Sequence, residues 1–516
     1  MCFVKACVSR SIFYGFQPKK YTVYFYLVTL ALAVPKILFT LRPEINLFTE
    51  EAQYWVWSQH LAWHYYSKPA LVAVLNFLST SLIGNTEIAI RINAILCGIG
   101  MAWVTYLFGT YLYSRKIGFW SALVLQSMPS WWLATTFHTT DSSLSFFWIL
   151  SIYLAYRGIK EEKSFWWVYA GIATVFGLMT KYVMLLIFPV LLLYLLYTKK
   201  WKTHQANFLM FVLISALGFV PAFIWNWQND FETLRHLLAL TGAEGVSSKS
   251  FSITTTSKSF FEYLKGQLAI VSLFLVPAWL ATFLHVYKNK SAALVYLILP
   301  GIIAFLFFGC LSFFKEAMVN WPAFAYTGFA IALARWMVAQ SRLWKTISYG
   351  GIYLSIALPI IFILPDYTGI KSSETVRKRE QMIVKRLLGH EQLAKRIDYL
   401  KDSLGISDEF FFSDSYHTAS ELSFYLSGNP QTYVLNMGSR KNQFNFWSGM
   451  EQFLGHQNTG VFVSWNYNTM ENKAIFQSLI YEETFVSKFH DIPKRDVRIQ
   501  VWSNLMEYKP ALLSTY

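Results

Sequence analysis

The segment RPEINLFTEEAQYWVWSQHLAWHYYSKP, residues 42–69, lies between two apolar stretches and carries two adjacent carboxylates, Glu50 and Glu51. If the segment is helical, Glu50, Tyr54 and Trp57 share one face, whereas Glu51 points about 100° away. The aromatic residues around the acids are typical of a helix at a membrane interface. An acidic pair there can hold a metal, orient a sugar or accept a proton. The alternative is an aromatic belt with ordinary solvated acids.

The composition indicates a membrane protein. The 516 residues are 55% hydrophobic and 18% aromatic, and only 14% are charged, whereas about a quarter of a soluble domain is charged. Apolar runs near the ~20 residues that cross a bilayer recur from Tyr21 to Pro365. The chain is therefore predicted to be a polytopic α-helical membrane protein.

We expect about eleven spans within residues 1–365, the predicted transmembrane catalytic domain, with an outer loop at 42–88 that carries the acidic pair. Residues 70–84 are apolar but short, which predicts a re-entrant or interfacial helix. The predicted spans are 21–41, 89–112, 118–134, 142–157, 165–179, 182–198, 206–226, 265–285, 292–311, 321–338 and 346–365.

The charges orient this topology. With the N-terminus in the cytoplasm, the inner loops hold 17 basic residues, as the positive-inside rule requires. Of the twelve acids before residue 366, only Glu161 and Glu162 lie on the inner side, which is more than that rule asks for, since acids contribute little to topology. The ten other acids face outward, which suggests an outward-facing polar site built from several loops. They are Glu44, Glu50, Glu51, Glu87, Asp141, Asp230, Glu232, Glu244, Glu262 and Glu316.

Residues 366–516 are predicted to form a small extracytoplasmic α/β domain. Residues 367–516 hold 17 Lys+Arg against 16 Asp+Glu, so the net charge of +15 lies among the apolar segments and does not indicate nucleic-acid binding. A basic amphipathic stretch at 373–404 is expected at the membrane surface. We predict strands at 409–413, 432–436, 460–465 and 498–502, and a helix at 416–426.

Other outer loops carry polar residues next to span ends. Asp141 is either a helix N-cap or an acid of the site. Lys181, between two spans, either snorkels to the interface or faces a lipid phosphate. Because several loops on one membrane face carry such residues, we expect them to converge on one site.

Several motifs, in order along nearly the whole chain, resemble those of the bacterial polyprenyl-phosphate-sugar glycosyltransferases of the GT-C fold. This group includes protein O-mannosyltransferases and the aminoarabinose transferase that modifies lipid A. The first-loop motif is EEAQYWVWSQHLAWHYYSKPALVA, in which Glu50 stands where the family usually has Asp. The later motifs are RINAILCGIG, TTDSSLSFFW, GLMTKY, IWNWQNDF, GQL, NWPAFAY and ELSFYLSGNPQTYVLNMGSRKNQFNFW.

The resemblance implies an inverting sugar transfer from a polyprenyl (undecaprenyl-type) phosphate to lipid A, lipopolysaccharide or a protein, on the outer face of the bacterial inner membrane. It makes Glu50, Glu51 and Asp141 the catalytic candidates, with either glutamate as the working acid. Lys68 and Lys181 are the candidates for holding the donor phosphate. The substrate-binding candidates are Tyr54, Tyr65, Tyr66, His138, Asn226, Asp230, Arg235, Glu316 and Asn320.

No nucleotide cofactor is expected, because the sequence has no P-loop and no GxGxxG motif after a strand. A divalent metal is left open, since His60, His64 and His236 are either ligands or interface residues. The alternative function is a transporter or flippase of lipid-linked sugars. Transporters tend to have repeats and mid-bilayer charges, but the sequence shows no repeat and nearly no ionisable residue at span centres. The sugar, the acceptor and the oligomeric state stay open.

Overall fold

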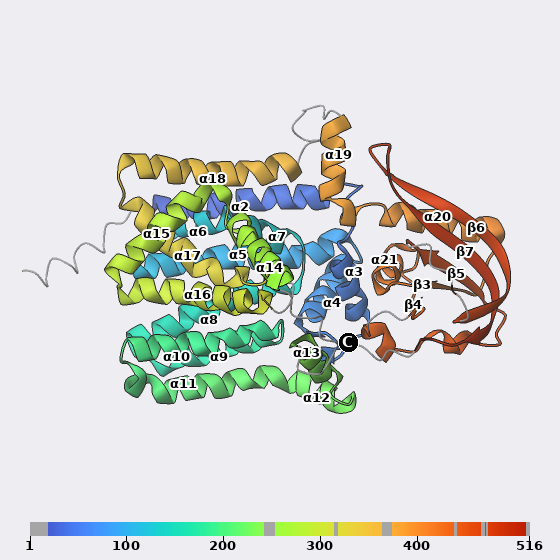
Figure 1. Cartoon of the computed structure of the whole chain (residues 1–516), viewed down its shortest axis with the longest axis horizontal. Coiled ribbons are helices and arrows are strands. Elements are labelled where there is room, and N and C mark those ends of the chain that lie inside the picture. Colours follow the sequence, from blue (N-terminus) through green and yellow to red (C-terminus); the bar gives the residue numbers. More distant parts are fainter. Residues whose placement is uncertain are drawn as a thin grey trace, which may run out of the picture.

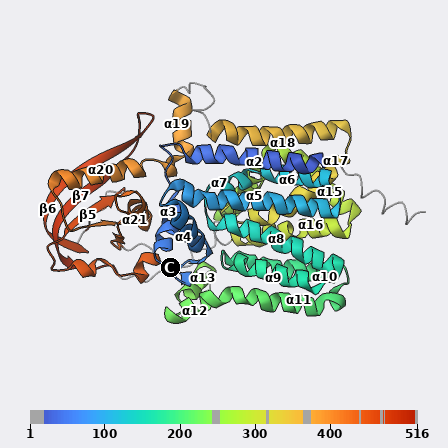
Figure 2. The ribbon, with the colours of Figure 1, turned by 180° about the vertical axis from the view of Figure 1, so that it is seen from behind.

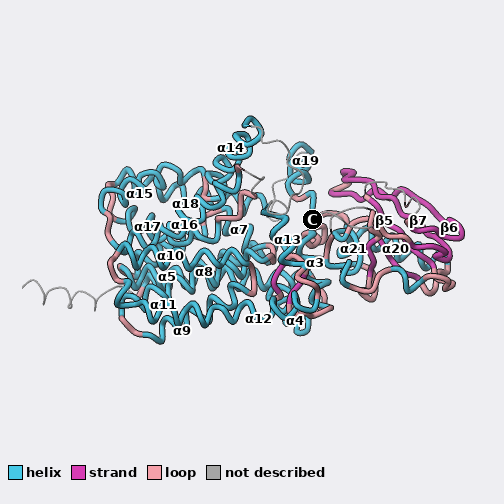
Figure 3. The backbone as a smooth tube through the Cα atoms, turned by 60° about the horizontal axis from the view of Figure 1, so that its bottom comes forward, coloured by secondary structure: helices cyan, strands magenta, loops and turns pink. Residues whose placement is uncertain are grey.

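A computed structural model describes residues 19–241, 253–313, 318–363, 374–437, 441–465, 470 and 473–511. The molecule is elongated, with a bundle of long helices at one end and a β-sheet at the other (Figure 1). Figure 3 shows the same division, with the long strands confined to the end opposite the bundle. The predicted outer acids Glu244 and Glu316 lie outside the described residues.

The bundle consists of helices that overlap every predicted span. Seen from behind, its first and last helices, α2 and α18, lie side by side (Figure 2). Among the described residues, four helices are long and apolar enough to cross a membrane, or five if one bent pair counts as a span. The bundle helices are α2 Lys20–Thr40, α5 Glu87–Leu112, α6 Arg115–Gln126, α7 Pro129–Thr136, α8 Thr140–Glu161, α9 Ser164–Leu178, α10 Ile187–Tyr197, α11 Trp201–Ala216, α12 Val220–Gln228, α14 Ile253–Ile270, α15 Val276–Asn289, α16 Ala292–Ser312, α17 Thr327–Val338 and α18 Arg342–Ile363.

Two predicted spans are interrupted. The chain bends by 81° between the helical segments Lys258–Ile270 and Leu273–Asn289, so the span predicted at 265–285 is not one straight helix. The bend falls at Ser272, whose φ of 79° lies in the left-handed region that ends a helix. The span predicted at 118–134 is divided into α6 and α7, because Pro129 at the start of α7 has no N–H to continue the ladder.

The first outer loop folds into α3 (Thr49–Gln59), a short hairpin of β1 (His64–Tyr65) and β2 (Lys68–Pro69), and α4 (Leu71–Ile83). Eight of the eleven residues of α3 are buried, so it is an internal helix. Within it, Tyr54 and Trp57 pack with Tyr65 in one apolar cluster. The thirteen-residue α4 is too short to cross a bilayer, in agreement with the predicted interfacial or re-entrant helix.

The C-terminal residues form a five-stranded sheet in the order β4-β3-β5-β7-β6. Strands β3, β4 and β5 are parallel, and β7 pairs antiparallel with β5 and β6. Each predicted strand overlaps one of these strands, but β6 was not predicted. The elements are β3 Glu409–Ser413, α21 Tyr416–Tyr425, β4 Thr432–Val434, β5 Thr459–Ser464, β6 Ala474–Phe489 and β7 Ile492–Tyr508.

The amphipathic stretch before the sheet divides into α19 (Glu374–Ile383), a 3-10 turn (Lys385–Leu387) and α20 (His390–Leu404). The apolar face of α20 packs in one core with Phe411, Val461 and Ile499 of the sheet. The prediction that this whole stretch lies on the membrane surface is therefore wrong for α20, because the same apolar periodicity serves a protein core.

Buried polar contacts fasten the C-terminal residues to the first outer loop. The Arg42 guanidinium makes a 2.8 Å ion pair with Glu380 of α19. The Asn46 N–H donates to the Leu387 carbonyl at 2.7 Å, and its side-chain oxygen accepts from the His390 N–H at 2.9 Å. Helix α21 packs against α3. The sheet domain is thereby fixed beside the acidic pair.

Candidate active site

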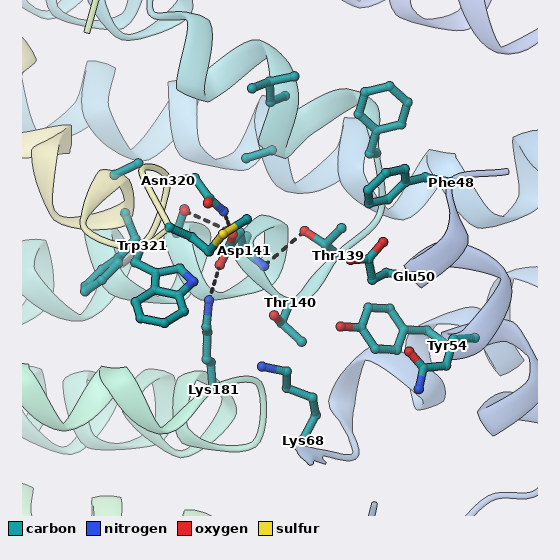
Figure 4. A pocket seen from close by; sticks show the side chains of 18 of the residues that line it. Phe48, Glu50, Tyr54, Lys68, Thr139, Thr140, Asp141, Lys181, Asn320 and Trp321 are labelled. Atoms are coloured by element: carbon teal, nitrogen blue, oxygen red, sulfur yellow. Dashed lines mark hydrogen bonds and ion pairs between the residues drawn. The ribbon is translucent and has the colours of Figure 1, made fainter. Parts of the chain in front are cut away.

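A cavity of about 840 Å³ opens where the helical bundle meets the sheet domain. Its lining comes from α3, the β1–β2 hairpin, the start of α8, the loop before α17 and the C-terminal residues. Figure 4 shows Glu50 and Tyr54 on one side of this space, and Asp141, Lys181, Asn320 and Trp321 on the other. Segments that are more than three hundred residues apart in sequence thus share one hollow.

Glu50 projects from the first turn of α3 into the cavity. Its Oε2 is buried and has no hydrogen-bond partner among the described residues. Burial is the main reason why the pKa of this carboxyl is raised above its ordinary value, and the charge of Arg386 partly offsets the rise. A half-buried carboxylate with an unengaged oxygen is suited to accept a proton or a hydroxyl hydrogen bond.

Glu51 does not line the cavity, although it neighbours Glu50. It is fully buried, and its carboxylate accepts from Arg91 Nε at 3.2–3.3 Å and Nη2 at 3.0 Å. It also accepts from the N–H groups of Phe48 at 2.9 Å and His138 at 2.8 Å. The predicted alternative of Glu51 as the working acid does not fit this position, because both oxygens are engaged in holding α3, α5 and α8 together.

Asp141 lies at the start of α8 and bonds across the cavity wall. One oxygen pairs with Lys181 Nζ at 2.7 Å, and the other accepts from Asn320 Nδ2 at 2.7 Å. All three residues line the cavity. Since both oxygens of Asp141 are engaged, its carboxylate positions the Lys181 ammonium and is less available as a base than Glu50.

Lys68 lines the cavity from β2, and in Figure 4 its amine points toward the same part of the cavity as that of Lys181. Tyr66, in the turn of the same hairpin, also lines the cavity, and its hydroxyl lies 3.2 Å from His236 Nδ1. Two ammonium groups that face one space can neutralise a phosphate.

Several predicted substrate-binding residues are not among the cavity-lining residues. Tyr65 stacks on Trp57 at 4.5 Å, and His138 is buried with its ring 2.7 Å from Asn76. Asn226 is occupied in accepting from the Thr233 N–H. These side chains support the fold around the cavity. The exposed residues Asp230 and Arg235 are also outside the lining, and Glu316 lies outside the described residues.

Each of the three histidines considered as metal ligands, His60, His64 and His236, contacts an aromatic side chain. The His60 ring is 4.8 Å from Trp447, and His64 Nε2 is 2.7 Å from the Tyr182 hydroxyl. Burial lowers the pKa of His64 to about 4, so the ring is neutral at physiological pH. Within the described ranges, no three His, Cys, Asp or Glu side chains come together as a metal-binding group.

Sequence reasoning missed the part of the lining that comes from the C-terminal domain: Arg386, Tyr416, His417, Lys441 and Gln443. Lys441 and Gln443 lie within the last of the quoted motifs, for which no site residue was predicted, and the other three lie in stretches without a motif. Lys441 pairs with Glu232 at 2.7 Å, which ties the domain to α13 (Glu232–Thr241). For Tyr416 and His417, which follow β3, the available signal was the general rule that ligands bind at the carboxyl ends of parallel strands.

Comparison with known proteins identifies the class. Residues 67–225 match the family "Dolichyl-phosphate-mannose-protein mannosyltransferase". The fold is similar to that of ArnT from Cupriavidus metallidurans, with a TM-score of 0.63 for the apo state over 93% of this chain and 98% of ArnT, at 14% identity. The structure of ArnT bound to undecaprenyl phosphate gives a TM-score of 0.64 over 94% and 98% of the two chains, also at 14% identity.

The chain is a glycosyltransferase, and its motifs, its fold and its match over residues 67–225 are similar to those of the GT-C polyprenyl-phosphate-sugar class. Among curated proteins it is similar to the lipid A galacturonosyltransferase RgtD of Rhizobium johnstonii. The two are 24% identical over 412 residues, which cover 75% of this chain and 82% of RgtD.

Proposed function

We propose that this enzyme moves a sugar from an undecaprenyl-type phosphate to an envelope acceptor, with inversion at the anomeric carbon. The observation that carries the proposal is one cavity that holds both the unengaged oxygen of Glu50 and the ammonium groups of Lys68 and Lys181. A solved structure of ArnT with undecaprenyl phosphate supports the donor class. The name of the relative RgtD supports lipid A as the acceptor, ahead of other lipopolysaccharide or protein hydroxyls.

The chemistry needs a base on one side of the sugar and cations on the other. An acceptor hydroxyl oxygen attacks the anomeric carbon while the bond from this carbon to the phosphate oxygen breaks. The hydroxyl proton passes to Glu50, and the polyprenyl phosphate leaves with the bonding electron pair. Attack opposite the leaving group inverts the anomeric carbon.

The cations stabilise the leaving group. A phosphate that gains negative charge as the bond breaks is stabilised by Lys68 and by Lys181, which Asp141 and Asn320 hold in place. Since the cavity walls restrict water, each of these charges interacts more strongly than it would in solvent.

We further propose eleven spans, a cytoplasmic N-terminus, and a cavity and C-terminal domain (366–516) on the periplasmic side of the inner membrane. The distribution of basic loops supports this orientation. The position of the cavity, at the end of the bundle that contacts the sheet domain, agrees with a site reached from the outer leaflet.

The test is a transfer assay with the purified full-length chain, a synthetic undecaprenyl-phosphate sugar and purified lipid A. We expect lipid A to gain the mass of one sugar, and the product to have the opposite anomeric configuration from the donor. Retention of configuration would refute the single displacement. Failure to transfer sugar from any undecaprenyl-phosphate donor, to lipid A or to the other envelope acceptors, would refute the function.

A further inference from the structure

Arg386 is a cavity-lining cation that the transfer step described above does not use. It lies in the short turn Lys385–Leu387, between α19 and α20, and its side chain is exposed to the cavity. Its guanidinium is 5.8 Å from the Phe48 ring, at the start of the helix that carries Glu50. It forms no ion pair with any residue that the structure describes, whereas Lys181 and Lys441 each have a carboxylate at 2.7 Å.

The backbone around Arg386 is held firmly. Leu387 and Leu388 are buried in an apolar cluster with Phe39 and Ile45, and the Leu387 carbonyl accepts from the Asn46 N–H at 2.7 Å. At the start of the next helix, α20, the His390 N–H donates to the side-chain oxygen of Asn46. An unpaired guanidinium on a fixed backbone is preorganised for a ligand, because little of its position has to be ordered on binding.

The cavity wall carries more cations than acids. The lining includes Lys68, Lys181, Arg386 and Lys441, against Glu50 and Asp141. Lys68 and Lys181 face one region together (Figure 4), whereas Arg386 is contributed by the opposite domain beside Phe48. A planar guanidinium binds carboxylate or phosphate through two parallel hydrogen bonds.

We propose that Arg386 forms a second anion subsite, which binds a carboxylate or phosphate group on the transferred sugar or on the acceptor. The subsite is distinct from the place of the donor phosphate and gives the C-terminal domain a direct part in substrate choice. The proposal rests on the transferase function proposed above.

The experiment compares steady-state kinetics of the purified full chain, at a pH on the plateau of the wild-type rate, for Arg386→Gln, Arg386→Lys and Lys385→Gln. Lys385 is the neighbouring exposed cation of the same turn and is not among the lining residues, so Lys385→Gln is the matched control. One arm varies the donor between undecaprenyl-phosphate hexose and the corresponding uronic acid. The other arm varies the acceptor between lipid A with and without its phosphates.

We expect Arg386→Gln to raise KM about tenfold or more for the substrate that carries the second anion. For its neutral counterpart, KM should stay within about twofold of the wild-type value, because no charge-assisted bond is lost. The KM of Arg386→Lys should be intermediate, since lysine keeps the charge but cannot form the two parallel hydrogen bonds of a guanidinium. The KM of Lys385→Gln should equal that of the wild type. The arm that responds identifies the source of the anion.

An equal effect of Arg386→Gln on charged and neutral substrates, or no effect on KM for either, would overturn the subsite while leaving the transferase function intact. Use of only neutral donors and neutral acceptors by the wild type would also overturn the subsite. If the wild type transfers no sugar at all from any of these donors, the proposed function itself fails.

Discussion

At the scale of single residues, α3 gives two adjacent glutamates opposite surroundings. Glu50 faces the cavity with an unengaged oxygen, and Glu51 is buried against Arg91. We therefore expect Glu50→Gln to lower kcat by about 10²–10⁴-fold, the usual contribution of a general base, without loss of thermal stability. Glu44→Gln, in the same loop but outside the cavity lining, is the control. Full activity of Glu50→Gln would remove Glu50 from the mechanism.

The surroundings of Glu50 also predict a pH dependence. Burial raises its pKa above the ordinary 4.5, the charge of Arg386 lowers it, and the nearby acids Glu51 and Glu421 raise it. Because the base must be ionised, kcat should fall as the pH drops through this raised pKa. Loss of the Arg386 charge should move the acid limb to higher pH. A pH–rate profile of Arg386→Gln beside Lys385→Gln measures the shift, and coincident profiles would contradict it.

Glu51 leads to a prediction about stability. Arg91→Met leaves the Glu51 carboxylate fully buried without its cation, so we expect a loss of about 3–5 kcal/mol, as for other broken buried pairs. The apparent Tm in detergent should fall, and it should fall less for the double variant Glu51→Gln with Arg91→Met. An unchanged Tm for Arg91→Met would show that the pair is not a structural support.

At the scale of elements, the ion pair of Arg42 and Glu380 links α19 to the end of α2. Glu380→Gln removes the carboxylate, so hydrogen exchange of the backbone at 385–390 should become faster and KM should move in the same direction as for Arg386→Gln. Glu391→Gln is the control, because the carboxylate of Glu391 pairs with Lys395 of the same helix, α20, and with no other residue in the described part of the chain. Unchanged exchange in Glu380→Gln would show that the apolar cluster alone fixes this turn.

Hydropathy and the spacing of apolar residues predicted most helices and strands, and the wrong or missed elements have physical causes. The bend at Ser272 comes from the backbone conformation of one residue, which the hydropathy of the segment does not reveal. The amphipathic α20 was assigned to the membrane surface because an amphipathic pattern does not show whether the apolar face of a helix packs against lipid or against a protein core. Strand β6 escaped notice because its side chains are mostly exposed. At the site, Asp141 and Lys181 were predicted from their positions at span ends, Glu50 from the first outer loop and Lys68 from the family resemblance. Arg386 reaches the cavity only through the tertiary fold.

At the scale of the whole molecule, the site requires the cavity and the sheet domain to lie on the same side of the membrane. Figure 1 shows α18 running along the bundle toward α19 and the sheet, so the α17–α18 loop lies at the far end. That loop precedes Arg342 and Lys345, which the positive-inside rule assigns to the cytoplasm. The two ends of the molecule should therefore face opposite compartments.

Two single-cysteine variants test this arrangement in a background without the four native cysteines. Ser403→Cys, exposed at the end of α20, should react with a membrane-impermeant maleimide in intact spheroplasts, because we place the sheet domain outside. Ser341→Cys, exposed between α17 and α18, should react only after the membrane is permeabilised. Labelling of both positions before permeabilisation would contradict the placement of the two ends in opposite compartments. The reverse pattern would place the sugar transfer on the cytoplasmic side of the membrane.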